Sequence, residues 1–466
     1  MSRTLGLTSD RDTIVARATP AGMGAIAILR LSGTEAHAIA GKLFRPRHRG
    51  HSIDSTVPGM MTLGTLYHPD TQERLDECLL VKWVAPHSYT GEDCIEFHLH
   101  GSPLICAELL SASQRLGARL ATPGEFTQRA YLNGKLDLSQ AEAICDLISS
   151  RTAQGSRLAL QQLNGGLSNQ CLRLRGRLVQ VVAELEAYVD FPEEGLGLSV
   201  TQRLVQELSG ITAELTKWAQ SANRGIVTLE GARVLLAGKP NAGKSSLFNA
   251  LLGRERAIVT PHPGTTRDTL EAEIDLEGVP VLLVDTAGLR EATEEVERIG
   301  IERTREELEK ADLILFLQDP TDPNLPLEEY QLCAGKRHLV VINKADQLFE
   351  SVSTLPTLEG HLSTLRISAR TGQGVPELEQ QILLSIVGTE EESESVLITN
   401  RRHRHAVEES IECLKRGTQD LSRNISPEFV LVDLMEAIAQ LDLITGRDGV
   451  DEEILDQIFS TFCLGK

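Results

Sequence analysis

The chain has 466 residues, of which 66 are acidic and 46 basic, so its formal net charge is −20. That balance excludes a protein coated for nucleic-acid binding and confines any such contact to local patches. The eight cysteines form no C-x-x-C pair, so neither a disulfide framework nor a structural zinc site is indicated. Residues 1–25 lack the apolar core of a signal peptide, and no run approaches about 20 apolar residues. We therefore expect a cytoplasmic protein without membrane contact.

The first half of the chain predicts two kinds of structure. Short β-rich runs, such as Leu79–Val84 and Cys94–His98, alternate with turns and one helix within residues 1–125. This mixture predicts a compact α+β domain. Residues 126–227 carry leucines and valines at helical spacing, interrupted at Gly165-Gly166, and predict the first part of a helical domain.

A glycine-rich loop, Gly238–Ser245, separates the apolar run Ala232–Ala237 from the helical run Ser246–Leu252. Its pattern, G-x-x-x-x-G-K-[ST], lets backbone N–H groups converge on phosphate oxygens, and the following helix N-terminus adds its dipole. We expect Lys244 to reach the β- and γ-phosphates and Ser245 to ligate Mg²⁺. The loop predicts binding of a nucleoside triphosphate.

Three further motifs, each after an apolar run, narrow the nucleotide to GTP. Asp285-Thr286-Ala287-Gly288 places a carboxylate beside the metal and a backbone N–H near the γ-phosphate. Asn343-Lys344-Ala345-Asp346 supplies a carboxylate for the guanine N1 and N2 donors, a pair that adenine lacks. Ser368-Ala369-Arg370 is expected to contact the base through its backbone. In order and spacing, the motifs resemble the translation-factor-like class of GTPases.

The residues predicted for hydrolysis depart from the Ras-like pattern. Leu289 follows the second motif, where Ras-like GTPases have a glutamine that orients water. Glu297 is a candidate to position water, and a solvated helix-face carboxylate is its alternative role. The Asn241 amide oxygen is a candidate ligand for K⁺, whose charge would replace an arginine finger. The predicted nucleotide contacts are Asn241, Ala242, Gly243, Lys244, Ser245, Ser246, Thr260, Pro261, His262, Pro263, Gly264, Thr265, Thr266, Asp285, Thr286, Ala287, Gly288, Asn343, Lys344, Asp346, Ser368, Ala369 and Arg370.

The motifs place a GTPase domain at residues 228–388, and residues 389–466 predict the second part of the helical domain. The predicted fold is therefore multidomain, α/β and α+β, with a Ras-like P-loop GTPase domain inserted in a helical domain. The basic cluster Arg401–His405 is a candidate contact for RNA or a partner, and a solvated helix face is the alternative.

Further stretches extend the pattern along the chain, notably Tyr89–Asp93, Pro123–Thr127, Lys135–Glu142, Gly264–Asp268 and Phe462–Lys466. Together with the GTPase motifs they resemble the MnmE (TrmE) family of bacterial and organellar tRNA-modification GTPases. One departure is the His262-Pro263 pair, where we expect an aliphatic residue followed by a small one.

The resemblance implies a potassium-activated GTPase and a homodimer built on the N-terminal domains, which hold 5-formyl- or methylene-tetrahydrofolate. It implies a flavoprotein partner, MnmG, which carries FAD and forms a heterotetramer-type complex. The substrate implied is tRNA, which receives an aminomethyl or carboxymethylaminomethyl group on C5 of its wobble uridine.

The resemblance also implies residue roles. Asn241, Thr260, His262 and Thr265 would ligate K⁺, and Ser245 and Thr266 would ligate Mg²⁺. Arg30, Glu96, Lys135 and Lys466 would surround the folate. The residues implied in chemistry are Lys244, Asp285, Glu297 and Cys463, and for Cys463 an incidental role near the C-terminus is equally open.

Two other classes of GTPase share part of this pattern. A GTP-dependent ribosome-assembly switch without modifying activity usually adds a basic RNA-binding module, whereas the regions added here are not strongly basic. A membrane-associated iron-transport GTPase shares the asparagine in the phosphate loop but requires spanning helices, which the hydropathy disfavours.

Overall fold

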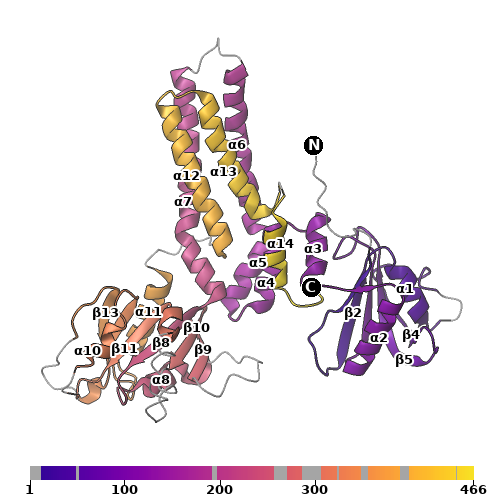
Figure 1. Cartoon of the computed structure of the whole chain (residues 1–466), viewed down its shortest axis with the longest axis horizontal. Coiled ribbons are helices and arrows are strands. Elements are labelled where there is room, and N and C mark those ends of the chain that lie inside the picture. The colour runs from indigo at the N-terminus through magenta and orange to yellow at the C-terminus, as the bar shows by residue number, and fades with distance from the viewer. Residues whose placement is uncertain are drawn as a thin grey trace. The chain divides into compact units, whose positions relative to one another are not determined.

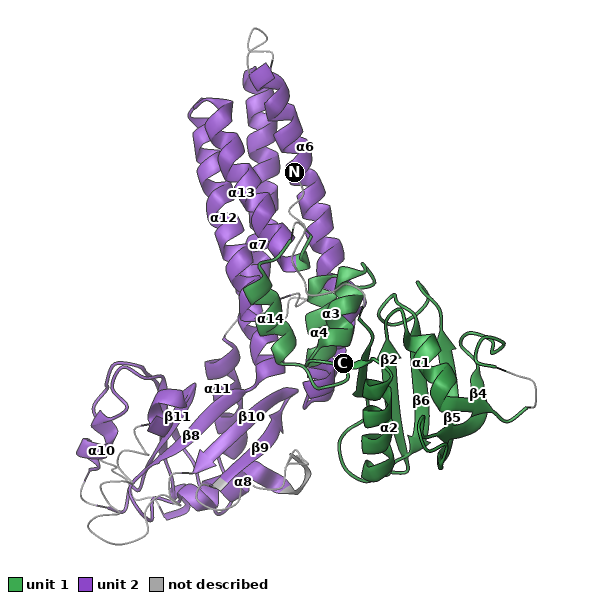
Figure 2. Ribbon diagram, turned by 45° about the vertical axis from the view of Figure 1, so that its right-hand side comes forward, with its two compact units in different colours: residues 1–145, 445–466 green, residues 146–444 purple. Residues whose placement is uncertain are grey.

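The computed structural model describes residues 12–48, 52–190, 197–256, 270–285, 306–322, 325–347, 355–388, 398–447 and 449–466. The chain divides into two compact units (Figures 1 and 2). Unit 1 combines Met1–Cys145 with Thr445–Lys466, and unit 2 is Asp146–Ile444. The C-terminal segment thus groups with the N-terminal residues. The three domain boundaries expected from the sequence stay a prediction.

Unit 1 is built on a seven-stranded sheet with the order β3-β4-β5-β6-β2-β1-β7. Helices α1 and α2 pack on the sheet over a core that includes Leu29, Ile39, Phe97 and Leu109. The alternation along β6 explains that core, because Ile95, Phe97 and Leu99 are buried while the residues between them are more exposed. The elements are β1 (Ile14–Arg17), β2 (Ile26–Ser32), α1 (Ala36–Leu43), β3 (Phe44–Pro46), β4 (Met61–Tyr67), β5 (Arg74–Trp83), β6 (Cys94–His100), α2 (Pro103–Arg115) and β7 (Arg119–Leu120).

Unit 1 is completed by α3 (Glu125–Leu132), α14 (Glu452–Ser460), the chain's end and the first part of α4 (Leu138–Ser149), which continues into unit 2 after Cys145. α14 packs on α3, and the last residues return to the sheet. The carbonyl of Lys466 accepts a hydrogen bond from the Phe126 N–H at 3.2 Å. Gly465 has a φ of 89°, and a Cβ there would lie 2.2 Å from the Arg17 carbonyl oxygen. Only glycine therefore lets the tail approach β1 this closely.

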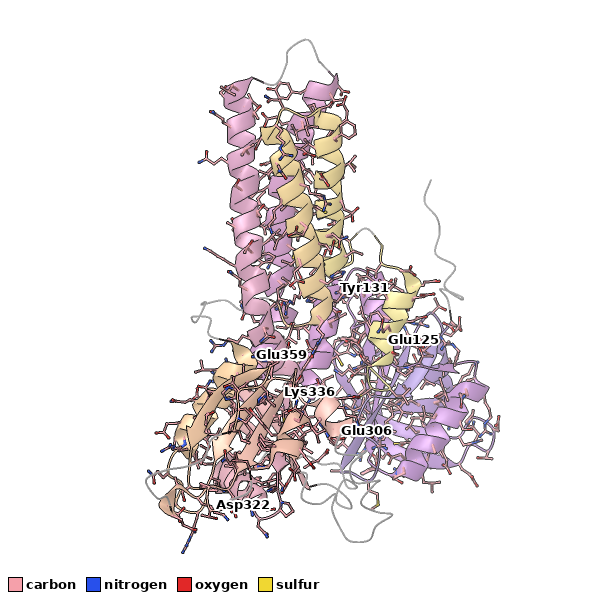
Figure 3. All side chains as sticks on the ribbon, turned by 60° about the vertical axis from the view of Figure 1, so that its left-hand side comes forward. Glu125, Tyr131, Glu306, Asp322, Lys336 and Glu359 are labelled. Carbon is pink, nitrogen blue, oxygen red and sulfur yellow. The ribbon has the colours of Figure 1, made fainter. Side chains whose placement is uncertain are left out.

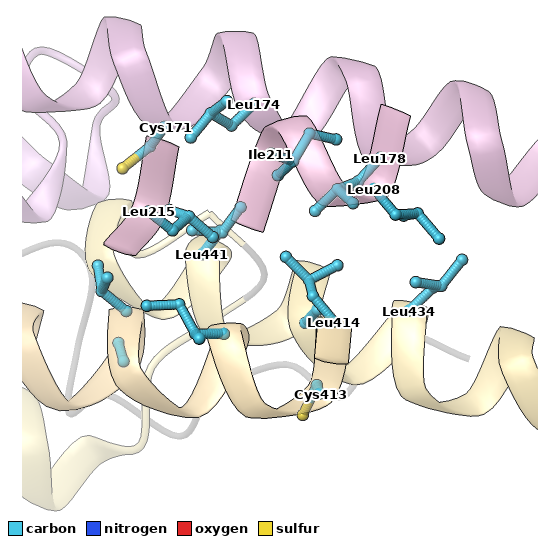
Figure 4. Packing of buried hydrophobic residues seen from close by; sticks show 14 of the residues in the cluster. Cys171, Leu174, Leu178, Leu208, Ile211, Leu215, Cys413, Leu414, Leu434 and Leu441 are labelled. Atoms are coloured by element: carbon cyan, nitrogen blue, oxygen red, sulfur yellow. The ribbon is translucent and has the colours of Figure 1, made fainter. Parts of the chain in front are cut away.

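Unit 2 contains a bundle in which α6 (Gly166–Asp190) and α7 (Leu198–Glu230) run beside α12 (Arg401–Ser422) and α13 (Pro427–Thr445), as Figures 1 and 2 show. The shorter α5 (Ala153–Leu163) precedes them. Leucines and isoleucines at three- and four-residue spacing, such as Leu204, Leu208, Ile211 and Leu215, form the buried stripe of α7 (Figure 4). This packing joins helices from both sides of the GTPase motifs.

The rest of unit 2 is a six-stranded sheet with the order β13-β12-β11-β8-β10-β9, parallel except for β9. Strands β11 and β12 are apolar except for Gln318 and His338 and are buried along their whole length, as expected for a parallel sheet covered on both faces. The elements are β8 (Ala232–Gly238), α8 (Lys244–Arg256), β9 (Leu270–Leu276), β10 (Val279–Asp285), β11 (Leu313–Gln318), α10 (Leu327–Gln331), β12 (His338–Ile342), a 3-10 turn η2 (Ala345–Gln347), β13 (His361–Arg366) and α11 (Val375–Val387).

These observations confirm the predicted fold class, in which a Ras-like α/β domain lies between the two parts of a helical bundle and follows an α+β domain. Among the described helices, none is both long enough and apolar enough to cross a membrane.

An ion-pair network joins two of the sequence stretches within unit 1. Arg129 contacts Asp12 at 2.7 Å, Glu125 at 2.9 Å and Glu92 at 3.2 Å. Arg119 contacts the same Glu125 at 2.6 Å (Glu125 is labelled in Figure 3). Burial alone would raise the pKa of Glu125, but hydrogen bonds from Arg119, Arg129 and the Thr122 N–H lower it overall. Glu125 therefore holds the start of α3 as a carboxylate.

Glu125→Gln should destabilise unit 1 by about 1–3 kcal/mol at pH 7, because two arginines lose a shared buried partner. Since the pKa of Glu125 is lowered in the folded state, its contribution is present above the unfolded value of about 4.3 and disappears as the pH falls through the folded value. Urea unfolding followed by Trp83 fluorescence, in a Trp218→Phe background, measures the difference. Equal midpoints at pH 7, or a difference from the wild type that does not shrink as the pH is lowered below about 4, would contradict the assignment, and exposed Glu108→Gln is the control.

Candidate functional site

The phosphate loop connects the end of β8 to the start of α8. Gly238, Asn241 and Gly243 have φ angles of 135°, 64° and 93°, in the left-handed region that favours glycine. A Cβ on Gly243 would lie 2.2 Å from Nδ2 of Asn343, so a larger residue would displace the neighbouring loop. The glycine spacing is thus needed for close packing between two motifs as well as for the turn.

Lys244 and Ser245 open α8 at this loop. Lys244 is buried, and its Nζ donates hydrogen bonds of 2.9 Å to the carbonyls of Gly238 and Lys239. The Ser245 hydroxyl donates to Oδ2 of Asp285 at 3.0 Å, and Asp285 is fully buried at the end of β10. A hydroxyl and a carboxylate are the hard oxygen donors that Mg²⁺ takes in nucleotide sites, so this pair fits that metal.

The two motifs predicted for guanine are hydrogen-bonded to each other and to the phosphate loop. The Asn343 side chain donates to the Ala242 carbonyl at 2.9 Å and accepts from the Ala369 N–H at 3.0 Å. The Ser368 hydroxyl donates to Oδ1 of Asp346 at 2.6 Å, while Asp346 itself is exposed. The carboxylate is therefore held in one orientation at the surface, as recognition of two adjacent N–H donors requires.

Two aspartates in the loop after β11 belong to this site and were not found from the sequence. Oδ2 of Asp319 lies 2.5 Å from Nζ of Lys344, and Oδ2 of Asp322 lies 3.3 Å from Nζ of Lys239. The sequence did offer one indication of these aspartates. They follow the apolar run of β11, so they lie at the sheet edge where the other nucleotide motifs begin. Strand-end carboxylates are too common for that signal to be specific.

Several predicted nucleotide residues lie outside the described part of the chain, and their roles stay predictions. They are Thr260, Pro261, His262, Pro263, Gly264, Thr265, Thr266, Thr286, Ala287, Gly288, Leu289 and Glu297. Asn241 is described and is exposed within the phosphate loop.

A second cluster lies in unit 1, where β2 pairs with β6. Arg30 and Glu96 are partners in the strand register, and the Arg30 guanidinium lies 2.8–2.9 Å from Oε1 of Glu96. The Tyr89 ring lies 5.2 Å from the Arg30 guanidinium carbon and 6.0 Å from Nζ of Lys466. The structure thus brings three of the four predicted folate residues together. Lys135 donates to the Pro86 carbonyl at 3.1 Å in the same unit.

Partial burial shapes the charges of this cluster. Burial, and then the nearby positive Arg30, lower the pKa of Lys466, while burial raises the pKa of Tyr89. Glu96 already neutralises Arg30, and a further anion beside Lys466 would relieve both its repulsion by Arg30 and its desolvation.

Aromatic and histidine members of the cluster were not predicted. Phe126 lies 5.6 Å from the Arg30 guanidinium carbon, and Nε2 of His98 lies 3.6 Å from Oε2 of Glu96. Period-two alternation along β6 places Glu96 and His98 on one face and was the signal available for His98. Nothing in the sequence alone places Tyr89 or Phe126 beside the C-terminal tail.

Two other predicted sites are only partly assembled. Cys463 is exposed in the tail, which leaves its role open. The basic cluster Arg401–His405 does not form one solvated face, because Arg402 donates to the Leu443 and Ile444 carbonyls and His403 is buried. Arg402 and His403 are therefore structural, and an RNA or partner contact would be left to the others.

Comparison with known families covers nearly the whole chain. The family model described as the GTP-binding protein TrmE N-terminus matches residues 13–135, and the model described as the MnmE helical domain matches residues 138–463.

Individual relatives are similar over their full length. A tRNA modification GTPase MnmE from Heliobacterium modesticaldum is 43% identical over 98% of this chain and 99% of its own length. The corresponding protein from Aquifex aeolicus is 42% identical over 98% of this chain and 100% of its own. Among solved structures, Aquifex aeolicus Era bound to GDP.AlF4- is 26% identical over 39% of this chain and 66% of that chain, with a TM-score of 0.26. That TM-score is too low to support a statement about the fold.

Proposed function

Since the chain belongs to the MnmE (TrmE) family of tRNA modification GTPases, we propose that it uses GTP hydrolysis to modify the wobble uridine of tRNA. With the flavoprotein MnmG and its FAD, it installs an aminomethyl or carboxymethylaminomethyl group on C5. The match over 98% of the chain carries this proposal. Two sites support the proposal: the nucleotide site of unit 2 for GTP hydrolysis, and the charged cluster of unit 1 for the one-carbon donor.

GTP and Mg²⁺ fit the edge of the parallel sheet in unit 2. The backbone of the phosphate loop and Lys244 would hold the phosphates, and Ser245 would ligate the metal with Asp285 beside it. When bound, Mg²⁺ neutralises charge that develops on the phosphate oxygens. Asp346, oriented by Ser368, recognises guanine.

We propose that K⁺ takes the role of an arginine finger, with Asn241, Thr260, His262 and Thr265 as ligands and Thr266 completing the Mg²⁺ site. Glu297 then positions the attacking water. Asn241 supports the cation assignment because its left-handed backbone conformation presents an exposed amide beside the phosphate loop.

Asn241→Ala should reduce the stimulation of GTP hydrolysis by K⁺ over Na⁺ towards unity, because one cation ligand is removed. Affinity for a fluorescent GTP analogue should fall by no more than about tenfold, since the alanine keeps the backbone donors of the loop but adopts the left-handed conformation of Asn241 less readily. The control is Asn249→Ala on the exposed side of α8. Undiminished stimulation by K⁺ in the Asn241 variant would sink the cation assignment.

The Arg30, Glu96 and Lys466 cluster fits a tetrahydrofolate derivative. Two cations suit the carboxylates of the ligand's glutamate tail, and a carboxylate suits the amino-pyrimidine edge of its pterin. Tyr89 and Phe126 provide ring faces beside the Arg30 guanidinium. We place the one-carbon donor, 5-formyl- or methylene-tetrahydrofolate, here. Lys135 extends the site, and Cys463 is a candidate reactive thiol in its tail.

Glu96→Gln should weaken binding of 5-formyl-tetrahydrofolate by about 10–100-fold, the range expected when a hydrogen bond to a charged group is lost. Isothermal titration calorimetry measures this affinity, with circular dichroism to verify folding. Glu77→Gln on the adjacent strand β5 also removes a carboxylate paired with arginine and should leave the affinity unchanged. Equal affinities of both variants and the wild type would place the folate elsewhere.

The proposed assembly is a homodimer of N-terminal domains that joins MnmG in a heterotetramer-type complex. GTP-state contacts favour closure of the GTPase domains, and hydrolysis releases them, so nucleotide state acts by shifting populations. The bundle contains helices from both sides of the GTPase domain, so it is the natural lever for that change.

Mass spectrometry of tRNA nucleosides from cells lacking the chain tests the proposed function. C5-aminomethyl-type wobble uridines should disappear and return with a plasmid copy, but not with a copy carrying Lys244→Ala, which lacks the phosphate-binding lysine. An unchanged nucleoside profile together with accumulated ribosomal subunits would favour the ribosome-assembly switch instead.

A further inference from the structure

The loop after β11 contacts both the phosphate loop and the guanine motif. Its position follows from the parallel register, in which Leu317 of β11 pairs with Gly238 of β8 and Gln318 pairs with Ile342 of β12. The residues that follow Gln318 therefore emerge between the phosphate loop and the motif that begins at Asn343. Asp322 is labelled in Figure 3.

Asp319 forms the shorter of the two ion pairs in this loop. Its Oδ2 lies 2.5 Å from Nζ of Lys344, and its Oδ1 accepts hydrogen bonds from the Thr321 N–H and hydroxyl at 2.9 and 2.7 Å. Burial alone would raise the pKa of Asp319, but the hydrogen bonds from Lys344 and Thr321 lower it, so the carboxylate is charged at neutral pH. The side chain is 16% exposed, which limits screening by water.

The lysine that it holds has an unfavourable backbone conformation. Lys344 has a φ of 57°, a left-handed conformation that residues other than glycine adopt at an energetic cost. Such a conformation persists only where neighbouring contacts enforce it. The Asp319 ion pair is one such contact, and the hydrogen bond from the Gln347 N–H to the Lys344 carbonyl is another.

Asp322 acts on the opposite side of the site. Its carboxylate lies 3.3 Å from Nζ of Lys239, the second residue of the phosphate loop, and its side chain is 35% exposed. Being longer and more exposed, this pair is the weaker of the two.

We propose that Asp319 and Asp322 are positioning residues that determine how long a guanine nucleotide stays bound. Each aspartate holds a lysine from a different nucleotide motif, and the Asn343–Ala242 hydrogen bond joins those motifs between them. A nucleotide that lies between the motifs leaves when they separate, and separation breaks the ion pairs. The aspartates therefore slow release of the nucleotide. Its association rate is little affected, because the nucleotide enters while the loops are apart and the ion pairs are not formed.

Stopped-flow displacement of a fluorescent GDP analogue from the full chain tests the proposal. Asp319→Asn should accelerate release by about tenfold and Asp322→Asn by about threefold, in the order of pair length and exposure. The association rate constant should stay within about twofold. Glu328→Gln, at an exposed position of α10 in the same connection, is the matched control and should release GDP at the wild-type rate.

Asp319→Glu separates positioning from a general structural role. The glutamate keeps the negative charge, so GDP release from Asp319→Glu should be slower than from Asp319→Asn. This difference should be present even if the two variants have the same melting temperature in the absence of nucleotide. Release from Asp319→Asn at the control rate would overturn the proposal. So would faster release that Asp319→Glu does not reduce at all, because the loop's shape rather than its charge would then be responsible.

Discussion

The carboxyl ends of five parallel strands, β8, β10, β11, β12 and β13, lie at one edge of the sheet in unit 2. Every described element of the nucleotide site depends on this constraint, because parallel strands deliver the loops that follow them to the same place. Asp285 is hydrogen-bonded to Ser245, which precedes it by 40 residues, and Asn343 is hydrogen-bonded to Ala242, which precedes it by 101. The apolar strands supply the rigidity, and short polar contacts set the positions of the loops.

A different constraint organises unit 1, where the chain's last residues return to its first strands. Gly465 permits a close approach to Arg17, and α14 packs on α3. The consequence is chemical as well as structural, because the return places the Lys466 ammonium near Tyr89 and Arg30. A cation-rich, aromatic site results from the two ends of the chain, since Lys466 follows Tyr89 by 466 − 89 = 377 positions.

The bundle of unit 2 requires both flanks of the GTPase domain. Arg175 on α6 makes two contacts of 2.6 and 2.9 Å with the buried carboxylate of Asp442 on α13. Removing one partner of a buried ion pair is costly, so this pair links α6 to α13 in addition to the apolar core that the four helices share.

The sequence by itself determined the fold class, the phosphate loop and the guanine motifs, because each depends on local patterns. The run His338–Ile342 is an apolar strand followed by a polar loop, and the structure has β12 over the same residues. Glycines at Gly238 and Gly243 likewise identify a turn that only small residues allow. The residues of the unit 1 cluster came from resemblance, since Arg30, Glu96 and Lys135 alone are ordinary surface charges.

Only the tertiary structure decided which distant residues meet. Asp319 pairs with Lys344, Tyr89 lies beside Arg30 and Lys466, and the cluster Arg401–His405 divides into buried and exposed members. The physical reason is that ion pairs, ring contacts and burial depend on strand register and helix packing, which bring together residues with no relation in the sequence. Local periodicity carries no information about that pairing.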